Sequence, residues 1–145
     1  MPTIGVTGAS GKAGSAVVRD LLEHGYDVVA SDLRPSSADL GAPVMVADLT
    51  SYGQVIEVLA GAEAVVHLAN IPAPGLATPA TTFGRNTTMN ANVFLAAAQL
   101  GLRRVVWASS ETTLGLAFDE QRPPRYAPVD EDHYPVPRST YALSK

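Results

Sequence analysis

The stretch PTIGVTGASGKAGS, residues 2–15, decides the fold. A short run rich in β-branched residues ends at Thr7, and three glycines follow at three-residue spacing, Gly8, Gly11 and Gly14. A helix with an apolar stripe is predicted directly after them. A dinucleotide pyrophosphate requires this order of strand, glycine-rich turn and helix, because glycines allow a tight turn, close approach of the backbone to the phosphates, and packing of helix on strand. The helix start also offers free N–H groups and the positive end of its dipole.

The remainder of the chain alternates between two kinds of apolar pattern. Short, almost continuous apolar runs predict further buried strands at residues 26–31, 43–47, 64–69 and 104–109. Periodic patterns predict helices at residues 15–24, around 55–59 and at 83–100. Strict alternation of strands and helices along the chain implies right-handed crossovers and a parallel sheet. The sequence therefore predicts an α/β fold with a doubly wound parallel sheet, in one domain that spans residues 1–145.

The composition excludes several classes of protein. Hydrophobic residues make up 46% and charged residues 17% of the chain, as in globular domains. The net charge of -4 disfavours nucleic acid as a partner. The absence of cysteine excludes disulfides and thiolate metal sites, and no metal site is predicted. Because no apolar run approaches the length of a membrane span, we expect a cytoplasmic protein without a membrane partner.

An acidic residue follows the second predicted strand. Asp32 lies 18 residues beyond Gly14, where a dinucleotide fold places the acid that accepts hydrogen bonds from the adenosine ribose. Its charge repels a 2′-phosphate, so Asp32 favours NAD over NADP. Arg34 is the counterweight, because a nearby arginine can hold that phosphate.

His67 lies inside the apolar run at residues 64–69. A histidine at the end of a strand is a candidate catalytic base. A histidine within an apolar strand is more often a core residue, and this is our interpretation of His67.

The end of the chain carries the candidate acid/base chemistry. Tyr141 and Lys145 are four residues apart, so on a helix they share one face. A lysine ammonium close to a phenol favours the phenolate, which is typical of a tyrosine that exchanges protons near neutral pH. Ser110 follows the fifth predicted strand at the carboxyl edge of the sheet, where its hydroxyl could hold a reacting oxygen.

As an ordered set, these residues resemble the extended branch of the short-chain dehydrogenase/reductase superfamily, namely the NAD-dependent epimerase/dehydratase family. The resemblance covers the whole chain. The matching segments are Thr7–Gly14, Asp32, Asp48-Leu49, His67-Leu68-Ala69, Asn86 ahead of Asn92-Val93, Trp107–Ser110, Pro128–Asp132 and Tyr141–Lys145.

The resemblance implies a Rossmann-type NAD(P)-binding fold and a role for each matching position. Ser110, Tyr141 and Lys145 would be the catalytic residues, and Lys145 would also bind the nicotinamide ribose. The pyrophosphate would be held by Gly8, Gly11 and Gly14, with contacts from Ser10, Lys12 and Ala13. Asp32, with Arg34 beside it, would bind the adenosine ribose, and Asp48 and Leu49 would border the adenine. Leu68, Ala69 and Asn70 would line the nicotinamide side, and Asn86 would lie near the cofactor.

Four features depart from the family pattern. Met89 stands where glycine is usual, Glu111 follows Ser110 where a small residue is typical, and Leu114 replaces a frequent tyrosine. Glu111 and Leu114 lie at the expected substrate edge, so they bear on the substrate rather than the fold. The family also runs to about twice this length, so we expect that the chain is truncated after Lys145, without the carboxy-terminal substrate lobe.

Two functions remain open from the sequence. The first is an NAD-dependent enzyme that moves hydride at a hydroxyl-bearing carbon of a sugar or nucleotide-sugar, as epimerase, dehydratase or dehydrogenase, with Tyr141 as acid/base. The second is a module that binds or senses NAD(P) without turnover, or an inactive fragment of such an enzyme. The expected partner is a small-molecule substrate, and a homodimer is left open.

Overall fold

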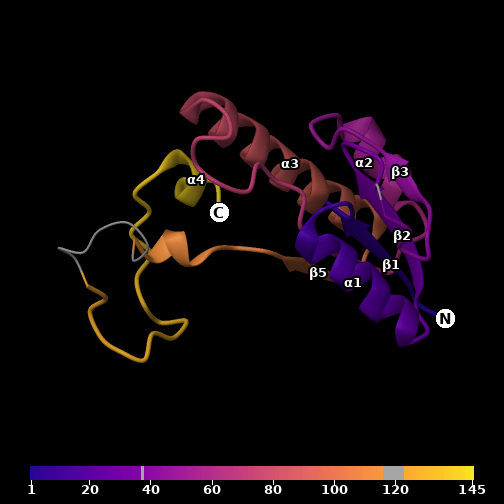
Figure 1. Ribbon diagram of the computed structural model, residues 1–145, viewed down its shortest axis with the longest axis horizontal. Helices are drawn as coiled ribbons and strands as arrows, with labels where there is room; N and C mark the ends of the chain where they lie inside the picture. Colours follow the sequence, from indigo (N-terminus) through magenta and orange to yellow (C-terminus); the bar gives the residue numbers. More distant parts are fainter. Residues whose placement is uncertain (37, 116–122) are drawn as a thin grey trace. The chain divides into compact units, whose positions relative to one another are not determined.

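The computed structural model describes residues 1–36, 38–115 and 123–145 (Figure 1). The predicted strict alternation of strands and helices is wrong at one place, because in the described residues β3 follows β2 with no helix between them. The elements are β1 (Thr3–Thr7), α1 (Lys12–Glu23), β2 (Asp27–Asp32), β3 (Val44–Val46), α2 (Tyr52–Leu59), β4 (Ala64–His67), α3 (Pro79–Leu100), β5 (Arg104–Trp107), the 3-10 helix η1 (Glu111–Leu114) and α4 (Thr140–Leu143). The chain divides into two compact units. Unit 1 comprises Met1–Asn70 and Thr88–Trp107, and unit 2 comprises Ile71–Thr87 and Ala108–Lys145.

The five strands form one parallel sheet in unit 1, in the order β3-β2-β1-β4-β5. β1 lies in the centre, with Val6 in register with Ala30 of β2 and with Val66 of β4. The order runs outward from β1 to β2 and β3 on one side, and from β1 to β4 and β5 on the other. This reversal next to β1 defines a doubly wound sheet, and the predicted Rossmann-type fold is confirmed.

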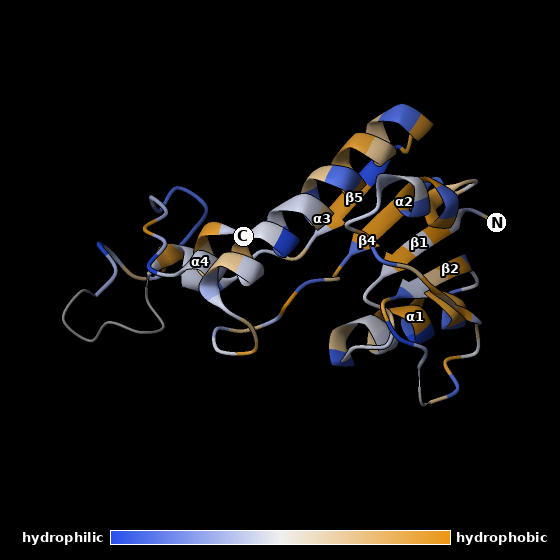
Figure 2. Cartoon of the chain, turned by 90° about the horizontal axis from the view of Figure 1, so that it is seen from above, coloured by the Kyte–Doolittle hydropathy of each residue, from blue (hydrophilic) through white to orange (hydrophobic). Residues whose placement is uncertain are grey.

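Both faces of the sheet are buried, as β4 illustrates. Its neighbouring residues Val65 and Val66 point to opposite faces, because side chains alternate along a strand. Val65 packs in a cluster with α2 and α3, whereas Val66 packs against a second cluster that includes Val18 of α1. Figure 2 shows the apolar strands between α1 on one side and α2 with the second half of α3 on the other. Two-sided burial explains why the strands are almost continuously apolar.

The predicted element boundaries differ from the observed ones at a few ends. β4 and β5 each end two residues earlier than predicted, at His67 and Trp107. The helix predicted at residues 83–100 begins at Pro79. Thr78 precedes it, and its hydroxyl accepts a hydrogen bond from the backbone N–H of Thr81 at 3.3 Å. Threonine followed by proline is a common helix start. The threonine hydroxyl accepts from a free N–H of the first turn, and proline has no N–H that would need an acceptor.

Unit 2 contains little regular structure apart from the start of α3. The predicted irregular segment from Glu111 to Thr140 begins with η1 and leads to α4, and its residues 116–122 lie outside the described residues. Across the described parts of both units, no helix combines the length and the apolar character needed to cross a membrane. α3 is long enough, but its threonines and asparagines make it too polar.

We predict opposite stability changes for two glycine-to-alanine substitutions in helices of unit 1. A Cβ atom at Gly14 would overlap the backbone at Gly8, so Gly14→Ala should lower the free energy of unfolding by about 1–3 kcal/mol. A Cβ at Gly53 of α2 would meet nothing within 4 Å, so Gly53→Ala should raise that free energy by up to about 1 kcal/mol. Urea denaturation followed by circular dichroism measures both. Equal effects would contradict the packing described for Gly14.

Candidate active site

The glycine-rich turn joins β1 to α1 in unit 1. Gly8 has a φ of +72°, and a Cβ atom there would lie 2.7 Å from the backbone nitrogen of Ala69. A Cβ at Gly14 would overlap the Gly8 carbonyl group. The N–H of Gly11 donates to the Gly8 carbonyl oxygen at 3.1 Å, which closes the turn. Only glycine fits at positions 8 and 14, because the backbone of the turn is in contact with the end of β4 and with the first turn of α1.

The N-terminus of α1 is suited to an anion. Gly11 is the N-cap, no side chain caps the helix, and its first turn carries no acidic residue. The first N–H groups of a helix have no intrahelical partner and carry the positive end of the dipole. Lys12 and Ala13 in this turn are exposed, and the Ser10 hydroxyl donates to the carbonyl oxygen of Arg34 at 2.9 Å. These residues fit a pyrophosphate.

Asp32, the last residue of β2, contacts the same turn. One carboxylate oxygen accepts a hydrogen bond from the Ser10 N–H at 2.9 Å, and the other accepts from the Arg34 N–H at 3.3 Å. Asp32 is half-buried and Arg34 is exposed. A carboxylate offers about four acceptor positions, so Asp32 can still accept from ribose hydroxyls while it holds the turn.

Asp48 and Leu49 follow β3, and both organise the start of α2. Asp48 Oδ1 accepts from the N–H and the hydroxyl of Thr50, at 2.9 and 2.8 Å. Leu49 is buried, and its carbonyl oxygen accepts from Nδ2 of Asn92 at 2.9 Å. The segment predicted to border the adenine is therefore fixed by α2 and α3 within unit 1.

The segment after β4 was predicted to line the nicotinamide side. The side chain of Asn70 donates to the carbonyl oxygen of Leu68 at 2.8 Å, and among the described residues its buried Oδ1 has no hydrogen-bond partner. A buried acceptor without a partner is costly, so it fits a site where a ligand donates a hydrogen bond. The interpretation of His67 as a core residue is confirmed, since its side chain is only 1% exposed.

Unit 2 contains the three predicted catalytic residues. Ser110 is the N-cap of η1, and its Oγ accepts from the N–H of Thr112 at 3.3 Å and from the Thr112 hydroxyl at 3.0 Å. The Ser110 hydroxyl itself donates to the carboxylate of Glu111 at 3.3 Å. Tyr141 lies in α4, which packs against η1. The turn that carries Ser110 and the helix that carries Tyr141 therefore meet within this unit.

The prediction that Tyr141 and Lys145 share a helix face is not met, because α4 ends at Leu143 and Lys145 follows its C-cap, Ser144. Lys145 still lies near Tyr141. Its ammonium is 5.8 Å from the centre of the Tyr141 ring and donates to the carbonyl oxygen of Ala108 at 2.9 Å. Burial lowers the pKa of Lys145 from its ordinary value. Tyr141 is buried, with 9% of its surface exposed. The arrangement places an ammonium group near the Tyr141 ring, and a cation near a phenol favours its phenolate form.

Asn86 of α3 was predicted to lie near the cofactor, and the structure shows what its side chain contacts. The residue is fully buried, and its Oδ1 accepts from the Ile71 N–H at 2.8 Å. Its Nδ2 donates to the Ile71 carbonyl oxygen at 3.3 Å and to the Ser144 hydroxyl at 3.1 Å. The Ser144 hydroxyl donates to the Tyr141 carbonyl oxygen at 2.7 Å. Asn86 thus connects the loop at Ile71 to the turn of Tyr141 and Lys145.

Sequence reasoning missed Ser144 as part of this arrangement. The only available signal in the sequence was its place between Tyr141 and Lys145, and the structure makes it the C-cap of α4. It also missed Asn90 of α3, whose Oδ1 is 3.1 Å from Nε2 of His67. Spacing along the sequence does not indicate this pair, because 23 residues separate the partners.

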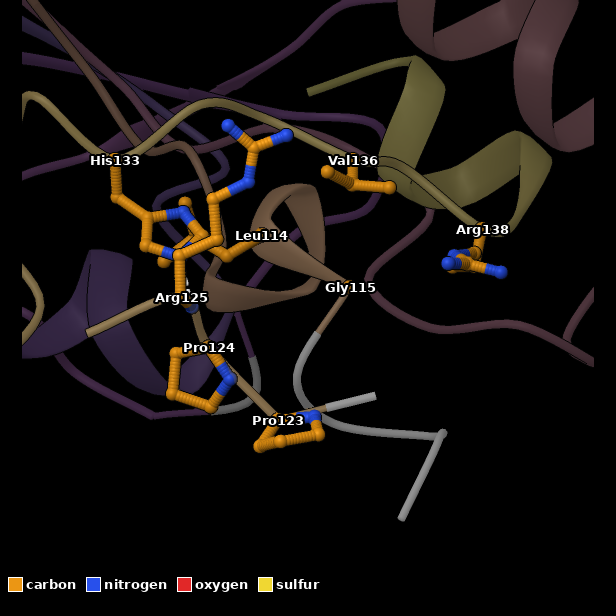
Figure 3. Close-up of a pocket in the computed structure, with 8 residues that line it drawn as sticks. All are labelled: Leu114, Gly115, Pro123, Pro124, Arg125, His133, Val136 and Arg138. Atoms are coloured by element: carbon orange, nitrogen blue, oxygen red, sulfur yellow. Dashed lines mark hydrogen bonds between the residues drawn. The ribbon is translucent and has the colours of Figure 1, made fainter. Parts of the chain in front are cut away.

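A pocket of about 110 Å³ lies in unit 2 between η1 and the segment before α4 (Figure 3). Figure 3 shows Arg125 and His133 side by side, with Leu114 behind them and Arg138 on the other side of Gly115. Ligand pockets usually measure about 300–1,000 Å³. The pocket is therefore too small to hold a nucleotide-sugar alone.

The comparisons with known proteins agree with this geometry. The model of the NAD dependent epimerase/dehydratase family matches residues 4–145. A short-chain dehydrogenase/reductase superfamily protein from Agrobacterium tumefaciens, crystallised with bound NAD, is 35% identical with a TM-score of 0.85, over 99% of this chain and 42% of that one. One curated relative is the NAD-dependent glucose-6-phosphate dehydrogenase of Haloferax volcanii, which is 29% identical over 97% of this chain and 57% of that protein. Another is the UDP-glucose 4-epimerase of Lacticaseibacillus casei, which is 28% identical over 99% of this chain and 44% of that protein.

The chain thus spans about half the length of these two curated relatives. The prediction of NAD as the cofactor is confirmed for the family, which is NAD-dependent, and similar solved structures contain bound NAD. The family model agrees with three features of the structure that are typical of dinucleotide binding, namely the glycine-rich turn, the uncapped start of α1 and the order of the strands. The chain belongs to the NAD-dependent epimerase/dehydratase family of the short-chain dehydrogenase/reductase superfamily.

Proposed function

We propose that this chain carries the cofactor-binding and acid/base residues of an NAD-dependent oxidoreductase or epimerase that acts on a hydroxyl-bearing carbon of a sugar or nucleotide-sugar. The observation that carries the proposal is the position of Lys145, whose ammonium lies 5.8 Å from the centre of the Tyr141 ring in the unit that also contains Ser110. The names of relatives support the substrate class, since they include a glucose-6-phosphate dehydrogenase, a UDP-glucose 4-epimerase and a uronate dehydrogenase.

Cofactor binding is assigned to residues of unit 1. The turn at Gly8, Gly11 and Gly14 and the first turn of α1 would hold the pyrophosphate, since free N–H groups there match its charge. Asp32 would accept from the adenosine ribose, Asp48 and Leu49 would border the adenine, and Leu68, Ala69 and Asn70 would line the nicotinamide side. When bound, NAD supplies the acceptor for the hydride that leaves the substrate carbon.

The protein's own part of the reaction is the handling of the proton. The Tyr141 oxygen takes the proton of the substrate hydroxyl as the carbon loses its hydride, and returns it in the reverse direction. The Lys145 ammonium stabilises the phenolate by its charge and would also bind the nicotinamide ribose. The Ser110 hydroxyl holds the reacting oxygen. Asn86, through Ser144, keeps the turn of Tyr141 and Lys145 in place. A homodimer and a cytoplasmic location remain predictions.

The charge of Asp32 should make the chain prefer NAD to NADP. We expect NAD to bind about tenfold more tightly, equivalent to about 1.4 kcal/mol, because a 2′-phosphate meets the carboxylate. Asp32→Asn keeps an acceptor for the Ser10 N–H but removes the charge, so it should reduce this preference to about twofold or less. Calorimetric titration with both cofactors measures the ratio. Asp39→Asn, on an exposed loop, is the control, and tighter binding of NADP by the unchanged chain would contradict the assignment.

The role of Tyr141 predicts a selective loss of turnover. Tyr141→Phe removes the hydroxyl that exchanges the proton, so kcat of the full gene product should fall by about 100-fold or more, with NAD affinity within about twofold. The assay follows NADH absorbance with UDP-glucose, glucose 6-phosphate and glucuronate as substrates. Tyr134→Phe, at a tyrosine that is 66% exposed in the same unit, should leave turnover unchanged. Turnover near that of the wild type in Tyr141→Phe would rule out this acid/base, and tight NAD binding without turnover in the wild type would favour the binding module.

A further inference from the structure

His67 lies at the carboxyl end of β4, in register with Thr7 of β1 on one side and Trp107 of β5 on the other. Both of its ring nitrogens have buried polar partners. Nδ1 lies 2.7 Å from the Thr7 hydroxyl oxygen, and Nε2 lies 3.1 Å from Oδ1 of Asn90 on α3. Thr7 is fully buried and Asn90 is 8% exposed. A histidine inside an apolar strand is therefore the centre of a polar row, which we call the His67 relay: Thr7, His67 and Asn90.

The partners determine where the protons of the relay lie. A side-chain amide oxygen only accepts hydrogen bonds, so Nε2 of His67 carries a hydrogen and donates it to Asn90. In the neutral ring Nδ1 then accepts the hydroxyl hydrogen of Thr7. The Thr7 oxygen in turn accepts from the N–H groups of Leu68 and Ala69, at 3.3 and 3.4 Å. Every group donates in the same direction, from the backbone after β4 to α3.

Packing holds the imidazole ring in this orientation. The edge of the His67 ring meets Phe94 of α3, with ring centres 6.5 Å apart and planes at 86°. Phe94 makes a second edge contact with Trp107, at 5.6 Å and 84°. The ring therefore has aromatic contacts in addition to its two hydrogen bonds, and rotation about its χ2 angle would lose both kinds of interaction.

The relay ends at the backbone that the cofactor site requires. Thr7 immediately precedes Gly8, and a Cβ atom at Gly8 would lie only 2.7 Å from the nitrogen of Ala69. The same Ala69 N–H, with that of Leu68, donates to the Thr7 hydroxyl. A small shift between the ends of β1 and β4 would therefore disturb both the glycine-rich turn and the segment assigned to the nicotinamide side.

We propose that His67 is a positioning residue of the cofactor site, which as a neutral imidazole anchors the Thr7 hydroxyl to Asn90 and so fixes the ends of β1 and β4 for NAD. The inference rests on the proposed binding of NAD in unit 1 and assigns no proton transfer to His67. It also explains the presence of Asn90, a polar residue on the buried face of α3, as the acceptor for the His67 ring.

The test is NAD affinity, measured by calorimetry on the 145-residue chain. His67→Phe keeps an aromatic ring but loses both hydrogen bonds, and Asn90→Leu removes the acceptor at the end of the relay. Each should weaken NAD binding about tenfold, the effect of losing one or two buried hydrogen bonds. Thr7→Val should do the same, whereas Thr7→Ser, which keeps the hydroxyl, should bind NAD within about twofold of the wild type.

Two controls separate positioning from general loss of stability. Val93→Ala creates a cavity in the apolar cluster on the same helix and removes no hydrogen-bonding group of the relay, so it should lower the melting temperature but leave NAD affinity unchanged. In the His67→Phe background, Asn90→Leu should have no further effect on affinity, because their connection is already broken. Nitrogen chemical shifts of the imidazole in the wild type should show a neutral ring with hydrogen on Nε2.

The outcomes separate this inference from the proposed function. Suppose that the wild type binds NAD. If His67→Phe and Asn90→Leu then bind NAD as tightly as the wild type, or lose no more affinity than Val93→Ala does, the positioning role is wrong and the proposed function is unaffected. A ring with hydrogen on Nδ1 would also overturn the relay. If the wild type does not bind NAD, both proposals are overturned.

Discussion

The close backbone contact at Gly8 is the constraint on which the rest of the cofactor site depends. The turn after β1 approaches Ala69 and the start of α1 so closely that positions 8 and 14 have no room for a side chain. This contact lets α1 begin at Lys12 with an uncapped N-terminus, and it brings the Ser10 N–H within 2.9 Å of the Asp32 carboxylate. The proposed phosphate site and the proposed ribose site thus both depend on one requirement of the backbone.

Most of the fold was predictable because its signals are local. Two-sided burial makes each strand an apolar run, and glycine is required at Gly8 and Gly14 for steric reasons that the spacing reveals. The start of α3 was predicted wrongly for a physical reason as well. Its first turn is stabilised by the hydroxyl of Thr78 and by Pro79, not by an apolar stripe, so a search for periodicity recognised the helix only at Phe83.

The candidate site was predictable by residue type but not by contact. Motif positions located Asp32, Tyr141 and Lys145, because their chemistry needs those side chains. The partners of Asn86 and His67 were not predictable, since 58 residues separate Asn86 from Ser144 and 23 separate His67 from Asn90. Such pairs depend on how the folded chain brings distant segments together, and apolar periodicity describes only which face of an element is buried.

The hydrogen bonds of Ser110 have a consequence for any ligand that arrives there. Its hydroxyl hydrogen is directed at Glu111 and its oxygen accepts from Thr112, so an incoming oxygen must displace a protein group. Such an exchange gains only about 0.5–1.5 kcal/mol, because one hydrogen bond replaces another. An apolar group would offer the Ser110 hydroxyl no partner in exchange, whereas the exposed carboxylate of Glu111 would be hydrated once displaced. A ligand with an oxygen at this position would therefore be favoured only slightly over one with an apolar group, and most of its affinity would come from contacts elsewhere.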